Sequence, residues 1–320
     1  DPATISSSLQ NCNSNNGWCT TLPTLSLSGS EPISGYNILA VEGSLNGQTF
    51  ACSGSTCDVP LNEGNNDFTF WALSSYGDSS EMGTLSAKVD TVSPALGLDI
   101  IATSGSNGWY VSPATITAIG SDSTSGLSSV FLSVDNGAGI SSTTLNEGMY
   151  RIVVQAEDNA GNIANSTTTI SVDTTTPMID VSVNGTLGSN GWYSSSMEVI
   201  TSATDETSGV ASLESSFDGG IYQAYISPIS FTDGYHTVQF KSVDKAGNDT
   251  ETSVQEFYVD TIAPAVDLPA EWEVNDTITY KVQDDGSGLS ALRVVIEDED
   301  EKFAKVAWDE AVSGKKFKSE

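Results

Sequence analysis

The hexapeptide Val89-Asp90-Thr91-Val92-Ser93-Pro94 determines the architecture, because close copies of it return twice further along the chain. The copies are Val172-Asp173-Thr174-Thr175-Thr176-Pro177 and Val259-Asp260-Thr261-Ile262-Ala263-Pro264, and the three prolines are 83 and 87 residues apart. A fixed period of this kind is typical of a structural unit repeated in tandem. The sequence therefore predicts a series of small modules rather than one large core.

Other landmarks keep one order inside each repeat: Asn-Gly-Trp, Ser-Gly-apolar, Leu-Asn-Glu-Gly and Asp-x-Ala-Gly-Asn. Asn-Gly-Trp is found at Asn16–Trp18, Asn107–Trp109 and Asn190–Trp192, and Ser-Gly-apolar at Ser34–Tyr36, Ser125–Leu127, Ser208–Val210 and Ser287–Leu289. Leu-Asn-Glu-Gly is found at Leu61–Gly64 and Leu145–Gly148, and Asp-x-Ala-Gly-Asn at Asp158–Asn162 and Asp244–Asn248. Several landmarks at one period predict four modules, which we place at residues 1–91, 92–174, 175–261 and 262–320.

Between the landmarks, apolar and polar residues alternate, as they do in a half-buried strand. Tyr150–Ala156 and Tyr235–Val243 show this pattern and are rich in β-branched and aromatic residues. Asp135–Gly137 and Asp218–Gly220 are typical of hairpin turns, because Asn and Gly tolerate positive φ. About seven short strands per module predict an all-β fold of tandem immunoglobulin-like β-sandwiches, arranged as an elongated rod.

Aromatic residues occupy two further positions in the predicted sandwiches. Tyr150 and Tyr235 begin strands where such a fold has a tyrosine corner, and we expect Phe68 at this position in the first module. The tryptophans of the Asn-Gly-Trp elements could stack on sugars. A Trp after a Gly turn more often fills the end of a core, so we expect core packing for Trp109 and Trp192.

Together these elements resemble the bacterial Ig-like repeats that occur in tandem on surface and secreted proteins. The resemblance rests on Asp-Thr-x-x-Pro, Asn-Gly-Trp-Tyr, Ser-Gly-Val, Asp-Gly-Gly and Asp-x-Ala-Gly-Asn. It covers residues 92–261 closely, residues 1–91 loosely, and the fourth module as far as Leu289. It implies an extracellular setting and a spacer or adhesive role, but no particular activity, because such folds carry many functions.

The charge balance excludes some partners. The chain has 42 Asp and Glu against 11 Lys and Arg, a formal net charge of −31. A nucleic-acid-binding protein needs a basic surface, so we expect no nucleic acid as partner. The longest apolar runs are only strand-sized, so we expect no membrane insertion. No basic leader with an apolar centre opens the chain, so we expect an export signal to have been removed and the protein to be extracellular or at the cell surface.

All four cysteines lie in the first module, and three pairings are formally possible. We favour Cys12 with Cys19 and Cys52 with Cys57, because each pair would close a short turn. Disulfides indicate an oxidising compartment outside the cytoplasm. The alternative is a zinc site made of all four thiolates, but the spacing fits zinc ligands poorly.

Acidic side chains recur at one end of each predicted sandwich. The start of strand A, the B–C loop and the F–G loop of a seven-stranded sandwich meet at this N-terminal pole. Carboxylate and amide oxygens from three loops can bind Ca²⁺, which takes about six to eight oxygen ligands. The candidates in modules two to four are Asp90, Asp122, Asp158 and Asn162; Asp173, Asp205, Asp244 and Asn248; and Asp260, Asp284 and Asp285. The alternative is that these side chains accept backbone N–H groups in tight turns.

The sequence contains no convincing catalytic set, so we predict that the protein is not an enzyme. The one histidine, His236, lies in a strand pattern, and the cysteines all have partners, which leaves no nucleophile with a base. We expect an extracellular structural or adhesive protein, the spacer rod of a cell-surface or filament-forming protein. Calcium is the only cofactor expected, and other protein subunits or surface glycans are the expected partners. Tyr222 and Tyr225, after a hairpin turn, are candidate exposed ligand contacts.

Two other functions remain open at this point. One is an accessory carbohydrate-binding segment of a larger secreted glycan-acting enzyme. The other is a filament or surface-layer subunit assembled by strand exchange at module four, because residues 262–320 are shorter than a full repeat and contain no Asp-x-Ala-Gly-Asn element. For the short module itself we favour the other explanation, that the chain is a fragment of a longer protein.

Overall fold

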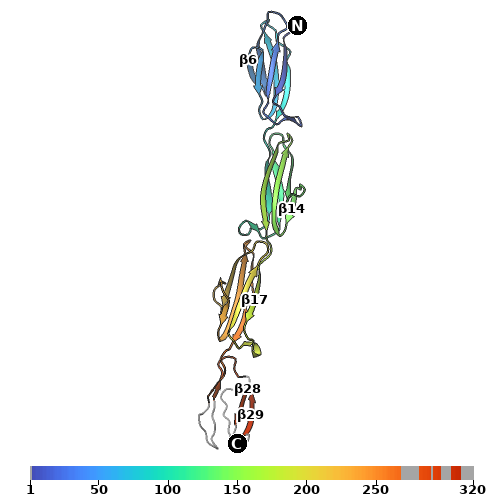
Figure 1. Ribbon diagram of the computed structural model, residues 1–320. Coiled ribbons are helices and arrows are strands. Elements are labelled where there is room, and N and C mark those ends of the chain that lie inside the picture. Colours follow the sequence, from blue (N-terminus) through green and yellow to red (C-terminus); the bar gives the residue numbers. More distant parts are fainter. Residues whose placement is uncertain (1, 268–280, 290, 297–303, 311–320) are drawn as a thin grey trace. The chain divides into compact units, whose positions relative to one another are not determined.

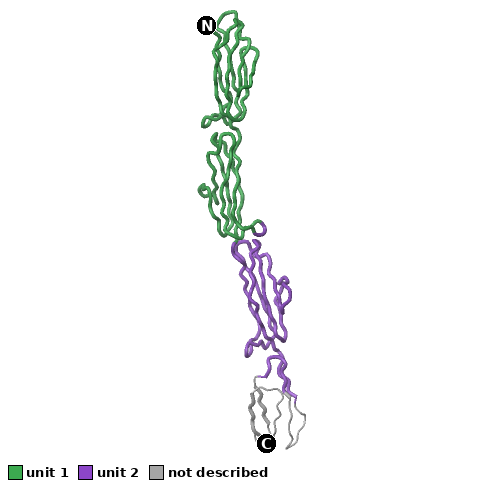
Figure 2. The backbone as a smooth tube through the Cα atoms, turned by 180° about the vertical axis from the view of Figure 1, so that it is seen from behind, with its two compact units in different colours: residues 1–104, 108–173 green, residues 105–107, 174–320 purple. Residues whose placement is uncertain are grey.

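The computed structural model describes residues 2–267, 281–289, 291–296 and 304–310 (Figure 1). Within these residues the chain is all-β, apart from one short 3-10 turn at Ser189–Gly191. Two compact units are distinguished, residues 1–104 with 108–173, and residues 105–107 with 174–320 (Figure 2). The described part has no helix that is long and apolar enough to cross a membrane. The paired sheets of the first three modules confirm the prediction of tandem Ig-like sandwiches.

The first module has two sheets with an apolar core that includes Leu25, Val41 and Phe68. One sheet has three strands, in the order β1 (Thr4–Gln10), β4 (Thr24–Ser30) and β7 (Thr56–Pro60). The other has six, in the order β2 (Ser14–Asn15), β3 (Trp18–Cys19), β9 (Gly83–Val89), β8 (Gly64–Ser74), β5 (Ile38–Leu45) and β6 (Gln48–Ser53).

The second module repeats this arrangement around Ile116, Leu132 and Ile152, whose side chains are fully buried. Its three-stranded sheet has the order β10 (Ala95–Ile101), β12 (Ala114–Ser121) and β14 (Ser142–Leu145). Its four-stranded sheet has the order β11 (Trp109–Tyr110), β16 (Ile163–Val172), β15 (Gly148–Asp158) and β13 (Leu127–Val134).

The third module has the same plan around Met197, Val199 and Phe240. Its smaller sheet has the order β17 (Met178–Asn184), β19 (Met197–Thr204) and β22 (Ile229–Phe231). Its larger sheet has the order β18 (Trp192–Tyr193), β25 (Gln255–Val259), β23 (Gly234–Asp244), β20 (Val210–Phe217) and β21 (Gln223–Ala224), with β24 (Asp249–Glu251) also paired to β23.

In the fourth module two antiparallel pairs are described. They are β26 (Ala265–Asp267) with β27 (Lys281–Gln283), and β28 (Ala291–Ile296) with β29 (Ala304–Glu310). The remaining residues of this module lie outside the described part. Its completion by strand exchange therefore stays a prediction.

The long strands β8, β15 and β23 occupy equivalent positions in the first three modules. Each has 11 residues and begins on a glycine, and the burial pattern is nearly the same in all three. Their last residues, Ser74, Asp158 and Asp244, pair with Ile38, Leu127 and Val210, respectively. In the first module, therefore, Ile38 takes the position of Leu127, and the expected correspondence of Tyr36 with Leu127 is wrong by two residues.

The corner position is filled differently in each module. Tyr150 donates a hydrogen bond to the Glu147 carbonyl (3.0 Å), which confirms a tyrosine corner in the second module. In the third module, β23 places His236 there, and Tyr235 is instead 51% exposed. In the first module the position belongs to Asn66, which donates to the Asn62 carbonyl (2.7 Å). The expectations for Tyr235 and Phe68 are therefore wrong.

The Asn-Gly-Trp elements do not fill the core with their tryptophans. Trp109 and Trp192 are half-buried, and the following Tyr110 and Tyr193 pack against the core clusters. Successive residues of a strand point to opposite faces, so only one of the two rings can turn inward. The residue that packs against the core is therefore the tyrosine after each tryptophan, not the tryptophan itself. In the first module, Cys19 occupies the position of this tyrosine.

The two favoured disulfides are both present. Cys12 is bonded to Cys19, and Cys52 to Cys57, which leaves no free cysteine among the described residues. A zinc site using these thiolates is thereby excluded. The first bridge joins the segment beside β2 to β3, and the second links β6 of the six-stranded sheet to β7 of the three-stranded sheet.

Candidate metal centre

Three carboxylates meet where the first module leads into the second, inside the first compact unit. Asp90 follows β9, Asp122 lies between β12 and β13, and Asp158 ends β15. One oxygen from each lies within 4.8 Å of the others. We call these residues the Asp90 cluster. Asp90 is 0% and Asp158 1% exposed, whereas Asp122 is half-buried. The convergence of three separate loops on one pole is what the sequence predicts.

Backbone N–H groups hold each carboxylate in place. Asp90 accepts from Val92 and Ser125 at 3.1 and 3.0 Å. Oδ1 of Asp122 accepts from Ser125 and Gly126 at 3.0 and 2.8 Å, and also from Thr124. Oδ1 of Asp158 accepts from the N–H groups of Gly161 and Asn162, at 2.7 and 2.9 Å. The turn-making role is therefore present in all three loops, and it also orients the carboxylates toward one point.

Turn-making alone leaves the charge of the cluster uncompensated. Two unit charges about 4 Å apart repel by about 4 kcal/mol at the effective dielectric constant near a protein surface. The residues that bond the three carboxylates supply N–H dipoles but no full positive charge. A hard divalent cation suits such a set of carboxylate oxygens. The donor set thus fits Ca²⁺, with Asp90, Asp122 and Asp158 as ligands.

Asn162 is placed as a donor. Its Nδ2 bonds Oδ2 of Asp158 and the carbonyl oxygen of Asp90, both at 2.9 Å. This amide therefore ties the end of β15 to the linker. The Nδ2 group of Asn162 thus acts as a positioning group, and the ligand role of its amide oxygen stays a prediction.

The second unit repeats these loop contacts at Asp205 and Asp244. Oδ1 of Asp205 accepts from Ser208 and Gly209 at 3.0 and 2.7 Å. Oδ1 of Asp244 accepts from Asn248 at 2.9 Å, and its Oδ2 accepts from Nδ2 of the same residue at 2.8 Å. Asp173, the third candidate of this set, is fully buried in the first unit, where its N–H donates to the Tyr110 carbonyl.

The fourth-module candidates follow the pattern in part. Asp260 accepts from the Ser287 N–H at 2.7 Å, as Asp90 does from Ser125. This bond is the main reason that the pKa of Asp260 lies below its ordinary value. Asp284 accepts from Gly288 at 2.7 Å, as Asp122 does from Gly126. Asp285 is exposed and accepts from the side chain of Gln283, the last residue of β27.

The first module has no counterpart of the cluster. Ser74 stands at the position of Asp158, and its hydroxyl donates to the Glu31 carboxylate. That bond is the largest cause of the lowered pKa of Glu31. The acidic residues of the linker and the two loops thus occur only in described modules that follow an Asp-Thr-x-x-Pro linker.

A second contact at these poles was missed by sequence reasoning. In the first unit, Nδ2 of Asn16 donates to the Asn159 carbonyl (3.3 Å), so an Asn-Gly-Trp loop bonds an Asp-x-Ala-Gly-Asn loop. In the second unit, Nδ2 of Asn107 donates to the Lys245 carbonyl (2.8 Å) in the same manner. The signal was available, because the Asn-Gly-Trp element recurs in the first three modules and the Asp-x-Ala-Gly-Asn element in the second and third. In the Asn-Gly-Trp element, the sequence pattern draws attention to the tryptophan and not to the asparagine that makes this contact.

The two tyrosine ligand candidates are half-buried rather than exposed. The Tyr225 hydroxyl accepts from the Thr201 N–H (3.2 Å), and its ring packs edge-on against Phe240. The Tyr222 hydroxyl donates to Glu251. Burial, followed by that bond, raises the pKa of Tyr222 to about 12. Both rings are therefore engaged within the third module.

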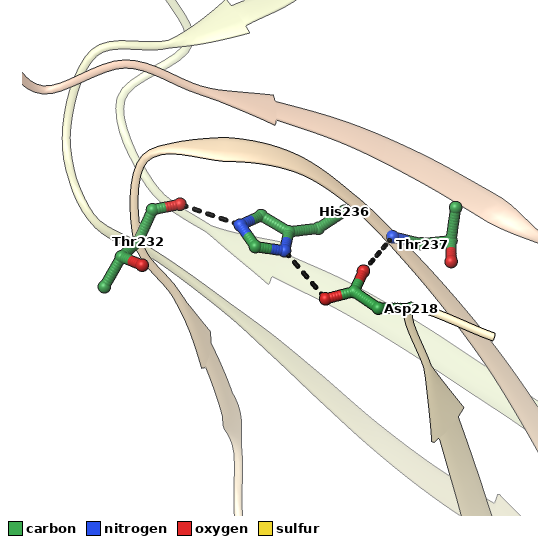
Figure 3. Close-up of polar contacts among 4 residues, drawn as sticks. All are labelled: Asp218, Thr232, His236 and Thr237. Carbon is green, nitrogen blue, oxygen red and sulfur yellow. Dashed lines mark hydrogen bonds and ion pairs between the residues drawn. The ribbon is translucent and has the colours of Figure 1, made fainter. Parts of the chain in front are cut away.

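His236 is held as a structural group. Its Nδ1 lies 3.1 Å from Oδ2 of Asp218, and its Nε2 lies 2.9 Å from the Thr232 carbonyl oxygen (Figure 3). The ring stacks on Phe231, and the side chain is 17% exposed. Both ring nitrogens of His236 thus have a partner within the third module.

Acid is expected to weaken the third module through Asp218. The Thr237 N–H, followed by His236, lowers the pKa of the Asp218 carboxyl. A carboxyl with a lowered folded-state pKa stabilises above its ordinary pKa, and the stabilisation is lost as the pH falls through the folded-state value. Melting of the third module, followed between about pH 5 and about pH 2, should depend less on pH in Asp218→Asn than in wild type. Equal pH profiles for the two proteins would contradict this role.

Comparison with known proteins identifies the module type. The family model described as a bacterial Ig-like domain matches residues 181–261, which lie in the third module. No curated protein matches the chain. The match agrees with the sheets of β17 to β25 and with the resemblance found in the sequence.

Several solved structures are similar at low identity. The tetra-tandem repeat from the extending region of a large adhesion protein is 13% identical, with 99% of this chain and 90% of that chain covered and a TM-score of 0.33. A bacterial ice-binding adhesin is 17% identical, with 81% and 99% covered and a TM-score of 0.28. The fibronectin(III)-like modules of Clostridium thermocellum CbhA are 18% identical, with 53% and 94% covered and a TM-score of 0.25.

Proposed function

We propose that the chain is a non-catalytic structural and adhesive protein of the cell exterior, whose successive sandwiches are joined by Ca²⁺. The Asp90 cluster carries this proposal, because carboxylates from a linker and two loops converge within 4.8 Å. A cation bound there would connect residues on both sides of the join. It would also offset the repulsion among three acids in a chain of net charge −31.

The chemistry of the other reactive side chains supports a non-catalytic role. All four cysteines are oxidised, and His236 bonds a carboxylate and a carbonyl within one module. The two disulfides and the bacterial Ig-like match support an extracellular location. Other protein subunits or surface glycans are the partners that suit a spacer or adhesive protein.

Calcium binding is tested by calorimetry and by melting of the full chain. The expected result is heat on titration with CaCl₂ and a higher melting temperature of the second module. Saturation at about 100 times Kd stabilises a folded site by about 2.7 kcal/mol. In Asp122→Asn the calcium-induced shift should fall sharply, because the amide oxygen can still accept the turn hydrogen bonds but the charge is gone.

Asp135→Asn is the matched control. Asp135 is also a turn residue of the second module and accepts from the Arg151 N–H (2.8 Å), but it is not in the cluster. Its calcium shift should equal that of wild type. Absence of both heat and a melting shift in wild type would leave turn formation as the sole role of these acids and would remove the calcium proposal.

A further inference from the structure

Three aromatic side chains form a row across one sheet of the third module. Trp192, Tyr258 and Tyr235 come from β18, β25 and β23, which are adjacent, and Tyr258 pairs in register with each of the others. The ring centroids are 5.4 Å apart between Trp192 and Tyr258, and 5.1 Å apart between Tyr258 and Tyr235. Tyr235 is 51% and Tyr258 38% exposed, and Trp192 is half-buried. We call these three residues the aromatic row.

The fold does not need these rings for its core. Their neighbours Tyr193, Phe257 and His236 point to the opposite face, where Tyr193 and Phe257 belong to the core cluster and His236 fills the corner. The row therefore lies on the outer face of the sheet. Exposed aromatic rings in contact with one another are a common sign of a binding surface.

Among the first three modules, in which the structure describes all three positions, the row is present only in the third. The corresponding residues, paired in the same register, are Trp18, Lys88 and Asn65 in the first module, and Trp109, Ser171 and Met149 in the second. In the first module, Lys88 lies over the Trp18 ring. The tryptophan is thus common to the first three modules. The two tyrosines occur only in the third of these, so the repeated fold does not require them.

Hydrogen-bonding groups border the row on the same face. Thr237 and Glu256, two residues from Tyr235 and Tyr258 along their strands, pair with each other in register. Desolvation, followed by the nearby Glu256 carboxylate, raises the pKa of the Tyr235 hydroxyl. The border is rich in acceptors, so a suitable ligand is rich in donors.

We propose that the aromatic row is a binding site for a neutral polysaccharide chain. A pyranose ring has an apolar face of C–H groups that packs on an aromatic ring and a rim of hydroxyls that donate to carboxylates, which matches both parts of this surface. The spacing of the aromatic rings is comparable to the advance of one sugar ring along an extended chain. The net charge of −31 and the acidic border disfavour an anionic polysaccharide.

The tilt of the rings selects a single flexible chain rather than a flat crystalline surface. Trp192 and Tyr258 are inclined by 49°, and Tyr258 and Tyr235 by 42°, as the twist of a sheet dictates. No plane can contact all three rings, but a chain whose successive sugars rotate can. The inference specifies a ligand for the adhesive role proposed above and rests on that role, but not on calcium binding.

The test is affinity electrophoresis of the full chain in gels that contain a soluble neutral β-linked glucan or xylan. The expected result is retarded migration of wild type, and an affinity at least about tenfold lower in Tyr258→Ala, which is about 1.4 kcal/mol. Tyr76→Ala is the matched control. Tyr76 is 56% exposed and packs against Tyr36 in the first module, so its loss should leave the retardation unchanged.

Three outcomes would overturn the site: no retardation by any neutral polysaccharide, retardation unaffected by Tyr258→Ala, or binding only to an anionic polysaccharide or to another protein. Tyr235→Ala gives a second variant at an exposed position, and circular dichroism verifies that both variants fold. The calcium-induced melting shift is measured on the same samples. A wild-type protein that binds no glycan but keeps the calcium-induced shift would refute the row alone and leave the calcium proposal standing.

Discussion

Replacing Phe240 with alanine is expected to destabilise the third module by about 3–5 kcal/mol, the usual cost of removing a buried phenylalanine. Phe240 is 0% exposed and lies at the centre of β23, in the cluster with Met197 and Val238. The Tyr225 ring packs edge-on against it at 6.1 Å. The variant loses both the transfer free energy of the ring and the contacts around the cavity that remains.

Hydrogen exchange in urea, read on peptides from residues 197–259, measures this loss without interference from the other modules. Phe217→Ala is the matched control, because Phe217 lies in the same sheet but is 47% exposed. Its effect should stay within about 0.5 kcal/mol. Similar losses in the two variants would show that the core of the third module is not where the structure places it.

Gly43→Ala is expected to destabilise the first module by about 3 kcal/mol, at the upper end of the cost of overpacking. Gly43 lies in β5, between β6 and β8. A Cβ there would collide with the Thr69 carbonyl oxygen and would come within 2.6 Å of Cζ of Phe50. The carbonyl belongs to the backbone of β8, so the clash is relieved only if the two strands separate.

The control for this substitution is Gly47→Ala. Gly47 has a φ of 81° and open space around it, so alanine should cost only the roughly 1 kcal/mol of a left-handed backbone. The double variant Gly43→Ala/Phe50→Ala should stay unstable, because the carbonyl clash persists when the ring is removed. Chemical unfolding of the first module checks both expectations. A Gly43→Ala protein as stable as Gly47→Ala would contradict the close approach of β5 to β8.

Strand periodicity and repeat landmarks were sufficient to predict the all-β sandwiches and both disulfides. Period-two patterning identifies the inward face of β15, where Ile152, Val154 and Ala156 are buried. The pairing of Cys12 with Cys19 follows from their closeness in the sequence. Local pattern was sufficient here because these contacts are made within or between neighbouring strands.

Register across strands could not be predicted in the same way. In the first module, Ile38 rather than Tyr36 takes the position of Leu127, and in the third module His236 takes the position of the corner tyrosine. Both outcomes depend on how many residues separate strands that pair at long range. The sequence places Tyr235 and His236 next to each other and gives no means of telling which faces inward. A slip of one residue exchanges the faces of a strand, so small errors of register misassign side chains completely.

The Asp90 cluster was predictable because topology brings the ends of three known elements to one pole. The placement of Asn162 was not, since an amide can present either its oxygen or its nitrogen. Nδ2 faces the neighbouring oxygens because they need a donor. The aromatic row was missed for a similar reason: Trp192, Tyr258 and Tyr235 are far apart in the sequence and become neighbours only through strand order.

The hydrogen bond from Asn16 to the Asn159 carbonyl has a consequence for how such a chain can change over generations. The asparagine recognises a main-chain oxygen, which every residue type supplies equally. The same contact made by Asn107 meets a lysine carbonyl at position 245, so the two repeats keep the contact with different side chains at this position. A duplicated or exchanged repeat would keep this link as long as the loop backbone is retained. The length of the array can thus vary by gene duplication without the need for compensating substitutions at that contact.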